Sequence, residues 1–215
     1  MNILLLGGSG RTGSRIYAQL LARRVHGAPD ASIARAGTAT VRAPSSDELD
    51  LTRMAAPEAW RPWLQDTGVV IHAAGVLRVR GDDTFANHLA ATRALCVAAR
   101  GSGLRHIVRL SCAGADENSA LPWFAAHGAM DAICNTAGLP ATIVRSGVMY
   151  FDTGSGSTRR CHPYALTLDW HSATGRLPLT CIDDAVAAVV NAALSSAPRR
   201  PVVRELTAPC LARAA

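Results

Sequence analysis

Apolar and polar positions along the chain form blocks that predict strands and helices in alternation. The first apolar run, residues 3–6, is followed by a glycine-rich segment and a helix-compatible stretch that reaches about Arg24. Further strand patterns occupy residues 32–35, 38–41, 68–72, 106–111, 141–145 and 202–206. Helical patterns occupy residues 58–65, 84–99, 121–136 and 183–195, and Asp183 and Asp184 are expected to cap the last helix. This alternation predicts an α/β fold with a doubly wound parallel sheet.

Residues 151–180 depart from this pattern. They contain Gly154, Gly156 and Gly175, two prolines and many polar residues, and no period is sustained. We expect an irregular segment, a long loop or a small lobe. A chain of 215 residues is long enough for a sizeable core but short for two full domains, so a single domain over residues 1–215 is predicted.

The glycine-rich segment, residues 7–13, predicts a phosphate-binding turn. Gly7 allows a tight turn, Gly10 lets the backbone approach a phosphate, and Gly13 lets the helix pack on the strand. The start of the helix then presents unpaired N–H groups to an anion. The spacing alone is weak evidence, but its place between a buried strand and a helix predicts a site for a dinucleotide pyrophosphate.

The positive charge of the chain does not predict nucleic-acid binding. The formal net charge is +6, yet the arginines are scattered and no aromatic-rich basic stripe accompanies them. No apolar run reaches the roughly 18 residues of a membrane helix, and the first residues lack the charged region of a signal peptide. We therefore expect a cytoplasmic protein whose partner is a small molecule, with no membrane partner.

All 22 basic residues are arginine, and the sequence contains no lysine. Mechanisms that need a lysine amine are therefore excluded, among them the Walker-type phosphate loop, Schiff-base chemistry and any tyrosine–lysine dehydrogenase couple. The six cysteines form no C-x-x-C pair and fall mostly within predicted helices or strands. They are interpreted as buried small apolar residues, and no metal site is predicted.

Several motifs in order along the chain resemble the atypical short-chain dehydrogenase/reductase superfamily, which has the Rossmann fold. The closest branch by this resemblance is the NmrA-like group with the small flavin and biliverdin reductases. The motifs are residues 7–13, 50–52 after the predicted third strand, 72–75 after the fourth, Ser111 after the fifth, 137–145 and 182–186.

The resemblance implies an NAD(P) cofactor and assigns its contacts. It places Gly7, Ser9, Gly10, Arg11, Thr12 and Gly13 at the pyrophosphate. Ala73, Ala74 and Gly75 are expected beside the adenosine ribose and phosphates, where small side chains leave room. Asp50 and Leu51 are also assigned to the cofactor, and Ser111 and His127 to its nicotinamide end.

The resemblance also favours NADP over NAD. In this branch an arginine after the second strand holds the 2′-phosphate of NADP, and Arg35 stands in that place with no acid following it. Arg42 takes this role if the second strand lies further along the chain, because residues 25–38 are long for this connection. A solvent-facing Arg35 without a ligand is the remaining alternative.

The chain departs from the family at the catalytic pair. Trp123 and His127 stand where the resemblance expects tyrosine and lysine, so the usual proton donor is missing. His127 is expected to hold the ribose hydroxyls or to act as a general acid, and Ser111 to orient a substrate carbonyl. The resemblance also implies that residues 151–180 cover the substrate, so Tyr164 or His162 in this segment is a further source of the acid.

Two functions of different kinds follow. The first is an NADP-dependent oxidoreductase that reduces a small carbonyl, enone, flavin or quinone-type acceptor, for which the proton can come from solvent. The second is a non-catalytic NAD(P)-binding redox sensor of the NmrA type. A cofactor-dependent isomerase or epimerase is a weaker third, because it needs the missing tyrosine as a base.

Overall fold

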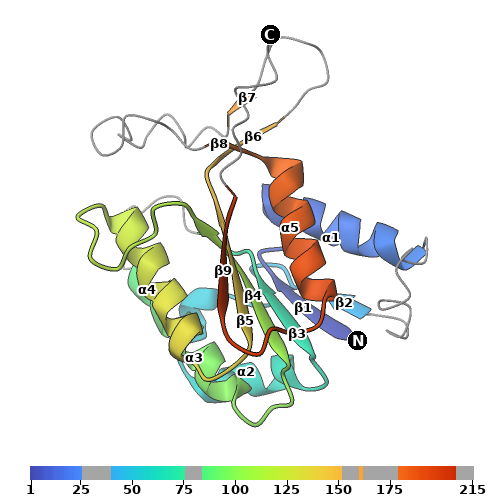
Figure 1. The fold of residues 1–215 in the computed structure, drawn as a ribbon. Coiled ribbons are helices and arrows are strands. Elements are labelled where there is room, and N and C mark those ends of the chain that lie inside the picture. Colours follow the sequence, from blue (N-terminus) through green and yellow to red (C-terminus); the bar gives the residue numbers. More distant parts are fainter. Residues whose placement is uncertain (26–39, 76–83, 152–159, 162–178, 207–215) are drawn as a thin grey trace.

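The computed structural model describes residues 1–25, 40–75, 84–151, 160–161 and 179–206. Within these ranges six strands form one sheet in which every neighbouring pair is parallel (Figure 1). This confirms the doubly wound parallel sheet. In the order of the sheet the strands are β2 (Thr40–Arg42), β1 (Asn2–Leu6), β3 (Val69–His72), β4 (His106–Cys112), β5 (Ala141–Ser146) and β9 (Val202–Leu206).

Helices cover both faces of the sheet, as Figure 1 shows. One face packs against α1 and α5 through a cluster that includes Ile3 and Leu5 of β1, and the other packs against α2, α3 and α4 through Leu4 and Leu6. Strands buried on both faces read as continuous apolar runs, which explains residues 3–6. Among the described helices, none has the length and apolar character needed to cross a membrane. The helices are α1 (Arg11–Val25), α2 (Pro57–Leu64), α3 (Thr84–Ala99), α4 (Pro122–Thr136) and α5 (Ile182–Leu194).

The second strand lies later in the chain than its first predicted position. Strand β2 pairs with β1 over Thr40–Arg42, so the strand pattern at residues 38–41 marks the neighbour of β1. The pattern at residues 32–35, with Arg35, lies outside the described residues. By position at the end of the strand beside β1, Arg42 is therefore the residue that takes the place first given to Arg35.

The expected cap of the last helix is wrong in one respect. Cys181 is the N-cap of α5 and makes no side-chain cap hydrogen bond, while Asp183 and Asp184 lie within the first turn. Asp183 instead accepts a hydrogen bond from Arg15 of α1 at 3.0 Å. Both carboxylates still lie at the positive end of the helix dipole, so acidic residues favour this position without capping it.

A second, small sheet adjoins the carboxyl end of β5. Its strands are β7 (Arg160–Cys161), β6 (Val148–Phe151) and β8 (Leu179–Cys181), in that order. Strand β7 lies inside the segment expected to be irregular, because a two-residue pairing leaves no readable period in a sequence. Residues 152–159 and 162–178 lie outside the described ranges, so the substrate-covering role of this segment stays a prediction.

Candidate active site

The glycine turn after β1 has a shape that only glycine allows at two positions. Gly7 has φ +82°, and a Cβ there would lie 2.7 Å from backbone atoms of Ala74 after β3. A Cβ on Gly13 would overlap the carbonyl oxygen of Gly7. The first turn of α1 is therefore pressed against the end of β1, and the turn after β3 closes on it from the other side.

The start of α1 offers hydrogen-bond donors to an anion. Gly10 N–H is used by the carbonyl of Gly7 at 3.0 Å, but the next N–H groups have no partner inside the helix. No acidic side chain lies in this first turn, and Ser9 and Arg11 are exposed beside it. The hydroxyl of Thr12 donates to Met149 Sδ at 3.6 Å, and its backbone N–H lies in the first turn of α1, so its contact with a phosphate stays a prediction.

A cavity of about 180 Å³ lies directly beside this turn. It brings together the turns that follow β1, β2 and β3 and the short 3-10 helix η1 (Leu51–Arg53), which are far apart in the sequence. Five residues assigned to the cofactor from the sequence line it: Gly7, Ser9, Asp50, Leu51 and Ala74. Pro44, Ser46 and His88 also line it, and none of these three was foreseen.

Asp50 has a structural task at this cavity. Its carboxylate accepts hydrogen bonds from the N–H and the hydroxyl of Thr52, at 2.9 and 2.7 Å, and caps η1. These hydrogen bonds hold the pKa of Asp50 below its usual value. Asp50 therefore shapes the cavity wall as a carboxylate, and its contact with a cofactor stays a prediction.

The side chain of Arg42 is hydrogen-bonded at the end of α2 and not at the cavity. Its guanidinium donates to the backbone carbonyls of Pro62 and Trp63 at the end of α2 and lies 4.8 Å from the centre of the Trp63 ring. It does not line the cavity. The residues that follow it, 43–46, contain no acid, and of the next carboxylates along the chain, Asp47, Glu48 and Asp50, only Asp50 lines the cavity.

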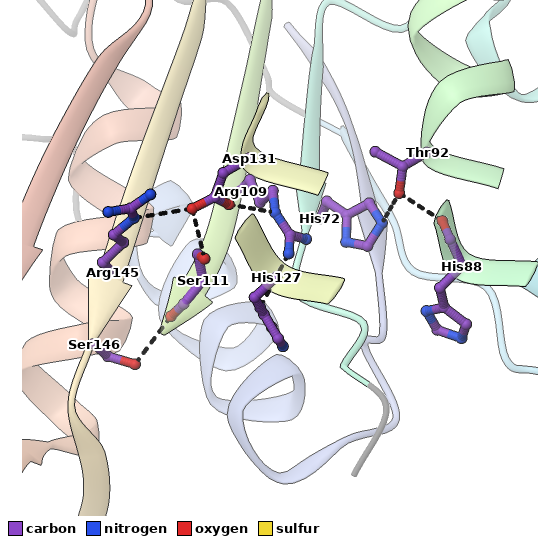
Figure 2. Close-up of polar contacts among 9 residues, drawn as sticks. All are labelled: His72, His88, Thr92, Arg109, Ser111, His127, Asp131, Arg145 and Ser146. Carbon is purple, nitrogen blue, oxygen red and sulfur yellow. Dashed lines mark hydrogen bonds and ion pairs between the residues drawn. The ribbon is translucent and has the colours of Figure 1, made fainter. Parts of the chain in front are cut away.

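A buried polar cluster lies across β4, α4 and β5. Asp131 of α4 accepts hydrogen bonds from Arg109 Nε, Ser111 Oγ and Arg145 Nε, each at 2.9 Å (Figure 2). Asp131 is 1% exposed and Arg109 is fully buried. Sequence reasoning missed both residues, although an arginine inside an apolar strand and an aspartate inside an apolar helix are the pattern of a buried ion pair.

His127, one turn before Asp131, is held by Arg109. Its Nδ1 lies 3.0 Å from Arg109 Nη2, and because arginine only donates, Nδ1 must accept and Nε2 carries the hydrogen. Burial and the charge of Arg109 lower the pKa of His127 well below its usual value. The ring is therefore neutral and suited to donate a hydrogen bond, and this geometry does not favour the general-acid role.

Ser111 is engaged in the same cluster. Its hydroxyl donates to Asp131, so it has no second hydrogen to give to a substrate carbonyl unless that bond breaks. The predicted orienting role of Ser111 thus competes with the cluster. The neighbouring Cys112 was not singled out from the sequence, and its thiol lies against the indole N–H of Trp123. Burial raises the pKa of Cys112 to about 12, so it is not a thiolate nucleophile.

Trp123 belongs to a group of three rings. Its ring centre is 4.4 Å from that of His127 and 6.5 Å from that of Phe85 on α3, in tilted and edge-on arrangements. Trp123 is half-buried, so part of the ring faces outward. An indole cannot replace the proton of a tyrosine, but it offers a flat apolar wall.

Two further histidines adjoin the cluster. His72 ends β3, is 1% exposed, and has its Nε2 3.4 Å from the hydroxyl of Thr92. Burial and the charge of Arg109 lower the pKa of His72 well below its usual value, and that of His88 to a lesser extent. Among the predicted site residues, Arg35, His162 and Tyr164 lie outside the described ranges.

A family model described as NAD(P)H-binding matches residues 7–169, which begin at the glycine turn and extend past the polar cluster. The chain belongs to the NAD(P)H-binding family. The match confirms the predicted nicotinamide cofactor without deciding between NAD and NADP. No curated protein matches this NAD(P)H-binding chain.

Solved structures of similar fold include an epimerase and a reductase. UDP-N-acetylglucosamine 4-epimerase from Bacillus cereus has a TM-score of 0.64 at 16% identity, with 97% of this chain and 78% of that chain covered. Triphenylmethane reductase from Citrobacter sp., solved with NADP(H), has a TM-score of 0.58 at 16% identity, with 94% of this chain and 68% of that chain covered. MoeE5, solved with UDP-glucose and NAD, has a TM-score of 0.61 at 17% identity, with 96% of this chain and 76% of that chain covered. These neighbours, at 16–17% identity, share the fold that the short-chain dehydrogenase/reductase resemblance implies, while the NmrA-like branch stays a prediction.

Proposed function

We propose that the protein is an NADP-dependent oxidoreductase that reduces a small planar acceptor, such as an enone, a flavin or a quinone. The observation that carries the proposal is the ring group of Trp123, His127 and Phe85 beside the polar cluster, in a chain whose glycine turn belongs to the NAD(P)H-binding family. A flat apolar wall favours a planar acceptor. Bound NADPH supplies the hydride.

The described residues fit such a cofactor. The cradle formed by Gly7, Gly13 and Ala74 has no room for a Cβ at either glycine, and it ends at free N–H groups of α1. At the other end, Nε2–H of His127 is the donor that would hold a hydroxyl of the nicotinamide ribose. These residues bind and orient the cofactor, and orientation is the main contribution a protein makes to hydride transfer.

The chemistry of the acceptor follows from the missing acid. At the two positions of α4 where the resemblance expects tyrosine and lysine, neither side chain supplies the proton, since Trp123 is an indole and His127 is neutral. Quinones and flavins take a hydride and draw the accompanying proton from water, so they need no acid from the protein. A simple ketone needs one, and Tyr164 or His162 is the proposed source for such a substrate.

NADP is proposed over NAD because residues 43–46, directly after β2, carry no acid, and Arg35 is kept as a candidate for the 2′-phosphate although it does not follow β2 as the resemblance implies. Arg42 is the alternative by position, but its guanidinium is bonded to the end of α2. The small-molecule partner and the cytoplasmic location proposed here rest on the sequence alone.

A redox sensor is the second candidate. The observation that favours it is that Ser111 and Asp131 satisfy each other inside the cluster, which leaves the described part of the site well suited to binding and poorly suited to proton transfer. A cofactor-dependent epimerase is less well supported, although epimerases are among the neighbours, because Trp123 has no base to offer.

The experiment that separates these candidates mixes purified protein with NADPH or NADH and with a free flavin, a simple quinone or a cyclic enone. The loss of the near-ultraviolet absorbance of NADPH measures turnover, and the change in cofactor fluorescence measures binding. Oxidation of NADPH by any acceptor supports the enzyme, and tight binding without oxidation supports the sensor. Binding of neither cofactor overturns both. The variant His127→Ala should bind NADPH more weakly, and unchanged turnover would remove His127 from the site.

A further inference from the structure

Arg109 is an unusual residue for its place in the fold. It lies in the middle of a parallel strand, fully buried, between Val108 and Leu110, which are apolar residues of the core. A guanidinium in such a place destabilises a protein unless its hydrogen bonds are met, and an apolar side chain of similar volume would pack there at least as well. The residue therefore calls for an explanation other than packing.

The contacts of Arg109 divide into two sets. Nε donates to Asp131, which is itself fixed by Ser111 and Arg145, so the guanidinium plane cannot swing. Nη2 donates to Nδ1 of His127 at 3.0 Å. Nη1 has no protein partner within the described residues, and Figure 2 shows the guanidinium between the rings of His127 and His72. One end of Arg109 is thus anchored, and the other end holds a histidine.

This arrangement fixes the hydrogen on His127. A neutral imidazole otherwise divides between two forms, with the hydrogen on Nδ1 or on Nε2. A donor that cannot accept leaves only the Nε2–H form. The hydroxyl of a ribose needs such a donor at a fixed place, and the chain has no lysine that could supply one.

We propose that Arg109 is a positioning residue, which holds the ring of His127 in its Nε2–H form so that Nε2 presents one fixed donor to a hydroxyl of the nicotinamide ribose. The inference rests on the proposed function only for the ligand of Nε2. The form of the ring follows from the contact between Arg109 and His127 alone.

The surroundings of His127 keep this donor constant with pH. The groups that face it are Arg109 and Cys112 from β4, His72 from β3, His88 from α3, and Trp123 and Asp131 from its own helix. The nearest charge is the cation of Arg109, and burial acts in the same direction, so the pKa of His127 stays low. Binding that depends on His127 should therefore be flat between about pH 6 and pH 8.

The first test is a nitrogen NMR spectrum of the wild-type protein with 15N-labelled histidine, in which the signals of His127 are identified by their loss in His127→Gln. We expect Nδ1 without hydrogen and Nε2 with hydrogen from about pH 6 to pH 8. A hydrogen on Nδ1, a mixture of the two forms, or titration within this range would overturn the inference. This measurement needs no cofactor and no folded variant of Arg109.

The second test compares Arg109→Met with Arg145→Met, a matched control that removes a second ion pair to Asp131 without touching His127. We expect Arg109→Met to raise the Kd of NADPH about tenfold or more and Arg145→Met about threefold or less. In Arg109→Met burial still keeps the pKa of His127 low, but no fixed donor faces Nδ1, so the NMR spectrum of this variant should show a mixture of the two neutral forms of the ring. Circular dichroism and melting curves establish that each variant is folded.

Equal losses in the two variants, or a pure Nε2–H form of His127 in folded Arg109→Met, would show that Arg109 is only one more ion pair. Arg109→Lys should restore the Nε2–H form in part, because an ammonium group also only donates hydrogen bonds. A wild-type protein that binds no NADPH would refute the proposed function, while the NMR spectrum would still decide the form of His127.

Discussion

The two ends of the candidate site are built in different ways. The glycine turn, defined by Gly7, Gly10 and Gly13, is made of backbone, and its close packing requires that these positions carry no side chain. The polar cluster, defined by Arg109, Asp131, Ser111, Arg145 and His127, is made of charged and neutral polar side chains from two strands and one helix. Substitutions that add atoms to the glycine turn should therefore disrupt its packing, whereas substitutions that remove atoms from the polar cluster should break its hydrogen bonds and ion pairs.

Removal of the charge at the centre of the cluster should have the largest effect. Asp131→Ala leaves two arginines without their shared carboxylate, one of them fully buried, and should lower the free energy of unfolding by about 3–5 kcal/mol. Denaturant unfolding measures this value. The control is Asp183→Ala, which breaks an exposed pair with Arg15 of similar length and should cost about 1 kcal/mol or less. Equal costs would mean that burial does not distinguish the two pairs.

Addition of atoms to the turn should have the next largest effect. Gly13→Val places a side chain on the carbonyl oxygen of Gly7, which moves α1 off β1 and should weaken NADPH binding about a hundredfold. Ala18→Val, at an exposed position one turn along the same helix, is the control and should bind normally. Titration of cofactor fluorescence measures both, and normal binding by Gly13→Val would contradict the assigned role of the turn.

Lowering the pH should reduce the stability of the folded protein through the buried histidines of the cluster and its neighbours. His72 and His127 are buried and neutral, with their pKa values well below those of the unfolded chain, so below about pH 6.5 the unfolded state binds protons that the folded state does not. Stability is then fully present above this pH and falls with further acid, by about 1.4 kcal/mol per pH unit for each histidine that stays neutral. Burial also lowers the pKa of His106, to about 4, which acts in the same direction.

The pH effect is measured by unfolding at a series of pH values. His72→Gln and His127→Gln should each reduce the slope of the free energy of unfolding against pH by the amount that corresponds to about one bound proton. A free energy of unfolding that does not change between about pH 7 and pH 5 would mean that these rings are charged in the folded protein.

The smallest effect expected is on the choice between cofactors. Arg35→Ala should weaken NADPH about tenfold more than NADH, because a guanidinium gains from the 2′-phosphate that only NADPH carries. Arg42→Ala is the matched comparison and should change both cofactors alike, since its guanidinium bonds the end of α2. The reverse outcome would move the role to Arg42, and equal losses in both variants would leave NADP without support.

Much of the turn could be predicted from the sequence, and little of the cluster. Gly7, Ser9, Asp50, Leu51 and Ala74 were assigned to the cofactor from short motifs, and all five line the cavity. His127 was recognised as a candidate, but its partner Arg109 was taken as part of a strand. Their contact joins residues 18 positions apart on different elements, and no local pattern encodes it.

The position of β2 in the chain also could not be predicted from the sequence alone. Two strand patterns preceded the predicted third strand, and only pairing with β1 decided that Thr40–Arg42 is its neighbour. Strand patterns report which residues suit a buried sheet, but the partner of a strand depends on the whole fold.

The sequence by itself determined the alternation of strands and helices, the glycine turn with its family, and the lack of lysine. These are local properties, because periodicity and backbone freedom depend on residues next to one another in the chain. Only the tertiary structure decided that Asp131 joins Arg109 to Arg145, and that His127 carries its hydrogen on Nε2. The reason is that the energy of a buried charge depends on the groups that surround it, and these groups are assembled only when β4, α4 and β5 pack together.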